Sequence, residues 1–135
     1  MSILFKKYFS LAIIFNKDLT KVYLKNVNGK LDAFLVESNV TGKAVMVELS
    51  KKINNSTNLL IKPEDWRNVI SLHQIDKSMS TTVVSSFIDT EDMKDVEILD
   101  INNLPDNVIP NLKWLIPLCL DVCVIGSNYN QVIVR

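Results

Sequence analysis

The sequence has few of the residues that build metal centres or disulfide frameworks. Its 135 residues include two cysteines, Cys119 and Cys123, and one histidine, His73. The cysteines do not form a Cys-x-x-Cys pair, and no Cys/His cluster has the spacing of a zinc site. The sequence therefore argues against a structural zinc and against disulfides, and it predicts that both cysteines are buried free thiols.

The sequence also lacks an excess of charge and a membrane-length apolar run. Fifteen Lys and Arg balance fifteen Asp and Glu, so no general attraction to nucleic acid or to an anionic membrane is expected. The apolar run Tyr8–Phe15 ends at Asn16-Lys17-Asp18 without a cleavage site, and a membrane helix needs roughly 20 apolar residues. We therefore predict a cytoplasmic protein that binds neither nucleic acid nor membrane.

What remains is the composition of an ordinary globular domain. Apolar residues make up 47% and charged residues 22% of the chain, close to globular averages. A chain of this length can bury well over half of its unfolded surface. We predict a single domain over residues 1–135.

Strand and helix patterns alternate along this domain. A central helix can be capped by Thr41, and its face Val45, Leu49 and Ile53 should pack on a sheet. A second helix should begin at Pro110, be kinked or ended near Pro117 and bury Leu115 and Cys119, with Trp114 packing beside them. The pattern predicts an α/β domain with a mixed sheet between two helices. The expected strands are Tyr8–Phe15, Lys21–Lys25, Leu31–Val36, Arg67–Ile75, Thr81–Ile88, Val96–Ile101, Val122–Ile125 and Gln131–Val134.

Two stretches near the ends of the chain resemble segments of a known protein family. Residues 12–22 read Ala-Ile-Ile-Phe-Asn-Lys-Asp-Leu-Thr-Lys-Val, and residues 109–117 read Ile-Pro-Asn-Leu-Lys-Trp-Leu-Ile-Pro. They resemble the first hairpin and the final helix of the Nudix hydrolase domain, especially its small phage and bacterial versions. The resemblance implies an α/β/α sandwich with a mixed β-sheet, and it implies a homodimer because such domains often pair.

The diagnostic Nudix box is degenerate in this chain. The family pattern is Gly, five residues, Glu, seven residues, then Arg-Glu-U-x-Glu-Glu-x-Gly-U, where U is aliphatic. Of this pattern the chain keeps Glu48-Leu49. The family's paired glutamates correspond to Lys51 and Lys52. The remaining departures are Ala33 and Asn54 for the two glycines, Asn39 for the early glutamate and Val47 for the arginine.

These substitutions have a direct chemical meaning. In a Nudix enzyme the helix glutamates hold divalent metal against a diphosphate, and hard cations need several oxygen ligands. Two lysines in place of two glutamates shift the local charge by about four units. The resemblance thus implies a fold whose metal catalysis is lost, and we predict no catalytic residues, no metal and no cofactor.

The candidate ligand-binding residues each have a structural alternative. Lys51 and Lys52 can bind phosphate without metal, or they can simply favour the helix dipole. Glu48 can be a ligand contact, or it can pair with Lys52 or Lys51 along the helix. The aromatic candidates can stack on a base, or they can pack in the core or its rim. These aromatic candidates are Tyr8, Trp66 and Phe87, and His73 is a further candidate that can equally be a residue of the sheet face.

Three functions follow from this reading of the sequence. The preferred one is a catalytically degenerate Nudix protein that binds a nucleotide or a nucleotide-derived small molecule without hydrolysing it. A phage origin would place it in the host cytoplasm, where it can sequester a nucleotide signal of host defence. The alternatives are a divergent hydrolase that uses Glu37, Glu91 or Asp92 from outside the box, and a protein-interaction scaffold.

Overall fold

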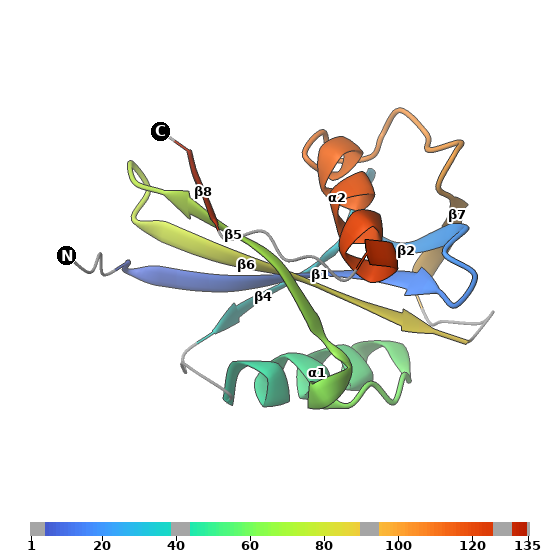
Figure 1. Ribbon diagram of the computed structural model, residues 1–135, viewed down its shortest axis with the longest axis horizontal. Coiled ribbons are helices and arrows are strands. Elements are labelled where there is room, and N and C mark those ends of the chain that lie inside the picture. Colours follow the sequence, from blue (N-terminus) through green and yellow to red (C-terminus); the bar gives the residue numbers. More distant parts are fainter. Residues whose placement is uncertain (1–4, 39–43, 90–94, 126–130, 135) are drawn as a thin grey trace.

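The central strand β1 (Lys7–Asn16) organises the architecture of the computed structural model, which describes residues 5–38, 44–89, 95–125 and 131–134. The sheet that contains β1 lies between the helices α1 (Ala44–Thr57) and α2 (Leu112–Ile125), as Figure 1 shows. This arrangement confirms the predicted α/β fold with a mixed sheet and two main helices. The other elements are β2 (Lys21–Val27), β3 (Lys30–Asp32), β4 (Phe34–Ser38), the short 3-10 helix η1 (Pro63–Asp65), β5 (Arg67–Gln74), β6 (Met79–Ile88), β7 (Val96–Asp100) and β8 (Gln131–Val134).

Strand β1 is paired along both of its edges. On one edge it runs parallel to β6 over its whole length, from Lys7 to Asn16. On the other edge it is shared by two antiparallel strands, because β4 pairs with Tyr8–Ala12 and β2 pairs with Ile14 and Phe15. Strands β2 and β4 therefore diverge from one edge of β1 and form a fork in the sheet.

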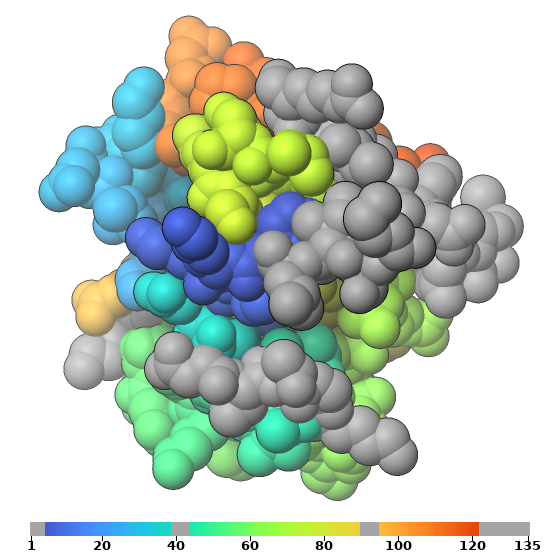
Figure 2. Space-filling view, turned by 90° about the vertical axis from the view of Figure 1, so that its left-hand side faces the viewer, coloured from blue at the N-terminus to red at the C-terminus, as the bar shows by residue number. Residues whose placement is uncertain are grey.

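The rest of the sheet extends outward from this centre. The main path is β3-β2-β1-β6-β5-β8, with β7 paired to β2. In Figure 2 the green surface of α1 lies below the blue and teal strands β1 and β4, and the orange residues that lead into α2 lie above. The sheet thus separates two distinct cores.

Alternate side chains of β1 pack into the two cores. Leu11, Ile13 and Phe15 pack on the α2 side, and Ala12 and Ile14 pack on the α1 side. All except Leu11 have no exposed surface. A strand that is buried on both faces has apolar residues at consecutive positions. The segment Tyr8–Phe15 therefore superficially resembles the hydrophobic core of a signal peptide.

The predicted helix faces are largely confirmed. Leu49 and Ile53 are each 1% exposed, and Leu115 and Cys119 are buried on the other side of the sheet. Val45 is only half-buried, because it lies near the start of α1. Thr41 and the side chain of Cys123 lie outside the described residues.

Other expectations need correction. Residues 122–125 continue α2 and do not form a strand, because a short apolar run can extend a helix as readily as a strand. Pro117 lies inside α2 without ending it, and the helix begins at Leu112, two residues after Pro110. The predicted strand Leu31–Val36 is divided at Ala33 into β3 and β4. Residues 131–134 form the predicted edge strand, parallel to β5.

Neither helix in the described ranges is long and apolar enough to cross a bilayer.

The contact of α1 with the sheet makes a testable prediction. Leu49→Ala should lower the free energy of unfolding by about 2 to 5 kcal/mol, because it removes a buried side chain and leaves a cavity. Val47→Ala is the matched control, since Val47 lies on the same helix with 55% of its surface exposed. It should change the free energy by less than about 0.5 kcal/mol. Denaturant unfolding of both variants measures the difference, and equal losses would contradict this packing.

Candidate functional site

Helix α1 places one of the predicted cations at the fork in the sheet. The ammonium of Lys52 lies 2.9 Å from Glu48 Oε1, one helical turn away, and it donates a hydrogen bond of 3.3 Å to the carbonyl oxygen of Glu37. The predicted pairing of Glu48 with Lys52 is thus present. Lys51 points to solvent from a different part of the helix surface.

A cavity of about 410 Å³ lies between β2 and β4, the two arms of the fork, and we call it the fork cavity. One wall comes from β2 and another from β4, and α1 closes the third side. Lys51 is not among the described residues that line it. The lining residues are Lys25, Val27, Asp32, Ala33, Phe34, Leu35, Val36, Lys52, Ile53 and Ser56.

A second cavity of about 250 Å³ lies between α2 and the sheet, and we call it the α2 cavity. It shares Asp32 and Leu35 with the fork cavity, so the two adjoin at the start of β4. Trp114 stands at its edge with 44% of its surface exposed. None of its described lining residues is Lys or Arg. They are Leu11, Asp32, Leu35, Leu72, Gln74, Met79, Thr81, Ile109, Asn111, Leu112, Trp114 and Leu115.

Asp32 is the charged residue common to both cavities. Burial raises the pKa of its carboxyl above the ordinary value of 3.8, and a hydrogen bond of 2.8 Å from the Ala33 N–H to Oδ1 lowers it in part. Asp32 also pairs across the hairpin with Lys25, since these two residues are register partners of β3 and β2. A partly desolvated carboxyl thus separates a cationic cavity from a mainly apolar one.

The aromatic candidates lie apart from these two cavities. Trp66 is 8% exposed in the core on the α1 side, where its Nε1 donates a 2.7 Å hydrogen bond to Ser50 Oγ. This contact makes it a packing residue in the described structure. Phe87 is 41% exposed, and the Arg67 guanidinium lies 5.8 Å from the centre of its ring.

Tyr8 and His73 gather around Phe5 at the start of β1. The Phe5 ring stacks on the His73 imidazole at 4.9 Å, and it meets the Tyr8 ring edge-on at 6.2 Å. His73 Nδ1 lies 2.9 Å from Ser80 Oγ. Of the seven candidates, the structure therefore brings only Lys52 to the fork cavity, with Glu48 holding its ammonium.

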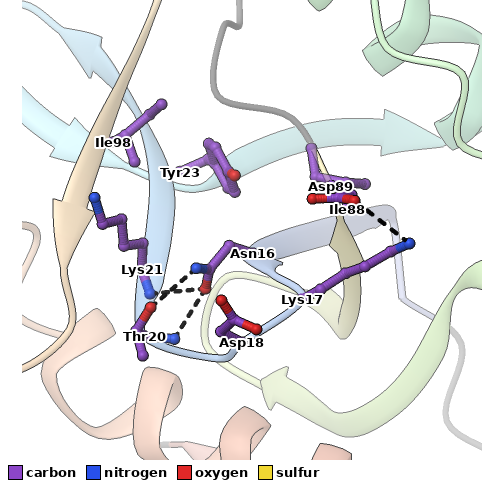
Figure 3. A pocket seen from close by; sticks show the side chains of 9 residues that line it. All are labelled: Asn16, Lys17, Asp18, Thr20, Lys21, Tyr23, Ile88, Asp89 and Ile98. Atoms are coloured by element: carbon purple, nitrogen blue, oxygen red, sulfur yellow. Dashed lines mark hydrogen bonds and ion pairs between the residues drawn. The ribbon is translucent and has the colours of Figure 1, made fainter.

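Another cavity, of about 640 Å³, lies at the opposite end of β2, and Figure 3 shows it. Asn16 Oδ1 accepts hydrogen bonds from the backbone N–H groups of Thr20 and Lys21 and so closes the turn between β1 and β2. Lys17 and Asp89 form an ion pair of 3.9 Å beside it. Two lysines and two aspartates line this cavity, so its charges balance and favour neither an anion nor a cation.

Several residues of the two adjoining cavities were missed by the sequence reasoning. Trp114 was expected to pack, yet it is exposed at the α2 cavity. The sequence pattern could have identified Gln74, because Ile70, Leu72 and Gln74 lie on one face of β5 and the third of these positions is polar. No pattern could have identified Lys25 and Asp32, since their proximity depends on the register of the hairpin.

The described residues around Glu48 are a poor set of ligands for magnesium. Within the described ranges no group of three or more His, Cys, Asp or Glu side chains comes close enough to hold a metal ion. Glu48 already pairs with an ammonium, and magnesium requires several oxygen ligands in near-octahedral geometry. Glu91, Asp92 and Asn39 lie outside the described residues.

Comparison with solved structures identifies the architecture. An ADP-ribose pyrophosphatase from Streptococcus suis superposes with a TM-score of 0.65 at 16% identity, covering 95% of this chain and 98% of that one. A MutT protein from Bacillus halodurans gives the same score at 12% identity, covering 94% and 89%. The chain has the Nudix fold. No protein-family model matches the sequence, and no curated protein matches it significantly.

A third similar structure comes from a different context. The C-terminal domain of mouse MUTYH, solved in complex with human PCNA, gives a TM-score of 0.66 at 11% identity and covers 94% of each chain. Structures that carry the Nudix fold thus include a domain seen in a protein complex as well as enzymes. The fold alone does not select between these functions.

The carboxyl of Asp32 gives a prediction about stability and pH. Its folded-state pKa lies above the unfolded value, so the folded chain binds more protons between the two values and stability falls as pH rises through that window. Asp32→Asn should therefore stabilise the protein at pH 7, and the gain should shrink as the pH falls and approach zero below pH 3.8, where the carboxyl becomes protonated in both states.

Denaturant unfolding from pH 3 to pH 8 tests this dependence. Asp76→Asn is the control, because it removes the same charge from an exposed turn. If Asp32→Asn instead loses stability at pH 7, the favourable interactions of the Asp32 carboxylate outweigh the cost of its burial, and the prediction is wrong.

Proposed function

We propose that the protein binds a nucleotide or nucleotide-derived small molecule in the two adjoining cavities and does not hydrolyse it. The observation that carries this proposal is the junction at Asp32 and Leu35, where a cavity with two lysines meets an apolar cavity edged by an aromatic ring. Nucleotides have the same two parts, an anionic phosphate chain and a flat heterocycle. The separation of charge between the cavities matches the separation of charge in such a ligand.

The fork cavity suits the phosphates. Lys25 reaches it from β2 and Lys52 reaches it from α1, so two ammonium groups face it from different elements. An ammonium binds phosphate as a point charge without requiring metal. Lys52 is held in place by Glu48 and by the Glu37 carbonyl, which limits the conformational entropy lost on binding.

The α2 cavity suits the heterocycle. Its described lining is mainly aliphatic, with Trp114 at the edge and the amides of Gln74 and Asn111 as polar groups. Ligand sites typically combine apolar walls with a few polar groups that fix orientation. An exposed tryptophan ring can stack on any base.

Loss of hydrolysis follows from the same helix. The position where the family needs metal ligands holds Lys51 and Lys52, and the one remaining box glutamate is in an ion pair with Lys52. Without a metal to offset charge on the scissile phosphates and to position water, bound diphosphate has no route to rapid cleavage. Binding without turnover would suit a protein that sequesters a nucleotide signal, as a phage protein acting in its host would.

Protein interaction is the second candidate function. Val27, Leu35 and Trp114 are 47%, 55% and 44% exposed around the two cavities, which is unusual for apolar side chains of this size. The MUTYH domain in complex with PCNA carries the same fold. A homodimer or a partner protein that covers these residues would leave no room for a nucleotide.

Charge reversal at Lys52 tests the phosphate site. Lys52→Glu should weaken the binding of ADP at least tenfold, because an attractive contact becomes repulsive beside the phosphates and tenfold corresponds to about 1.4 kcal/mol. Lys51→Glu is the matched control, since it makes the same charge change one residue away without lining the cavity. It should change the dissociation constant by less than about threefold. Titration calorimetry with ADP and ADP-ribose measures both, and equal effects would refute the assignment.

A turnover assay tests the absence of hydrolysis. We expect no magnesium- or manganese-dependent cleavage of nucleotide sugars, dinucleotide polyphosphates or nucleoside triphosphates, because the box lacks its paired glutamates. Phosphate and mononucleotide release can be followed against a control without metal. Turnover that disappears in Glu48→Gln would instead establish the divergent hydrolase with Glu37, Glu91 or Asp92.

A further inference from the structure

The last residue of β5 carries a buried acceptor beside the α2 cavity. Gln74 is the last residue of β5 and lines this cavity from the sheet. Its Oε1 is buried and accepts no hydrogen bond, and it is the one side-chain polar atom in the described part of the chain with this property. A buried acceptor without a donor destabilises the free protein. A ligand in the cavity gains affinity when the amide of Gln74 turns towards it and accepts a hydrogen bond from it.

The surroundings of Gln74 restrict what that donor can be. Leu72 and Met79 flank it with apolar surface, and the described cavity lining contains no Lys or Arg that could donate instead. Asp32 lines the same cavity and adds a second acceptor. A phosphate group brings no donor at neutral pH, so it cannot satisfy the Gln74 oxygen. The donor must therefore come from the uncharged end of the ligand.

We propose that Gln74 determines specificity and selects a purine that carries an exocyclic amino group over the same purine without it. This inference rests on the proposed function, since it names the ligand class of the same site. The amide places an acceptor beside a donor, and the amino group of a purine next to a ring nitrogen is its complement. A half-turn of the amide exchanges the positions of its oxygen and its nitrogen. The amide then still offers one acceptor beside one donor, in the opposite order.

The geometry of the cavity supports a heterocycle at this position. Its volume of about 250 Å³ accommodates one bicyclic base. Trp114 and Gln74 both line it, the first from α2 and the second from the sheet. A base that stacks on the indole can direct its edge towards β5. In this arrangement the ring supplies affinity and the amide distinguishes between rings.

Two pairs of nucleotides that differ only in the amino group test the proposal. They are AMP with purine riboside 5′-monophosphate, and GMP with IMP. In at least one pair the amino member should bind the wild-type protein at least tenfold more tightly by titration calorimetry. Gln74→Met, which keeps the length of the side chain and removes its polar atoms, should reduce this preference to within twofold. The nucleotide that lacks the amino group should bind this variant about as well as it binds wild type.

Asn68→Leu is the matched control, because it removes an exposed amide from the same strand at a position that does not line the cavity. It should keep the tenfold preference. Equal binding of both members of each pair to wild type would overturn the role of Gln74 and leave the proposed nucleotide binding intact. A preference that survives Gln74→Met would overturn it as well. If none of the four nucleotides binds, the proposed function fails together with this inference.

Discussion

The shared edge of β1 is the constraint on which the rest of the structure depends. One strand pairs with β4 along its first half and with β2 at its end, so these neighbours must diverge. Because β4 leads into α1 and β2 leads into β3, the divergence fixes where the helix can pack. It also opens the sheet at one place without exposing the core, since β1 itself remains buried against β6 and both helices. The fork cavity is a direct consequence of this pairing.

The charges placed at this fork decide its chemistry. A helix that supplies several carboxylates to the same position creates a metal site, whereas this helix supplies an ammonium that is already paired with Glu48. The Lys52 side chain of this pair is half-exposed, so the pair contributes little to stability. Its effect is to orient Lys52 towards the carbonyl of Glu37 and the cavity. The side chains that the helix carries, and not the backbone fold alone, therefore decide the chemistry at this position.

Asp32 connects the electrostatics of the two cavities. It is the last residue of β3, and its carboxyl accepts a hydrogen bond from the N–H of Ala33, the residue that separates β3 from β4. The same residue sets an acidic boundary between lysines on one side and apolar side chains on the other. The last residue of β3 thus sets the polarity where the two cavities adjoin.

The sequence by itself determined the layers of this protein. Continuous apolar character in β1 and the helical stripe of Leu49 and Ile53 are local patterns, and they are sufficient to predict a sheet between two helices. The ion pair of Glu48 with Lys52 was equally predictable, because helical spacing brings residues four apart together. Only the tertiary structure decided which side chains share a cavity. Lys25, Asp32, Gln74 and Trp114 come from four elements, and strand register and helix packing, which no local pattern encodes, bring them to the two adjoining cavities.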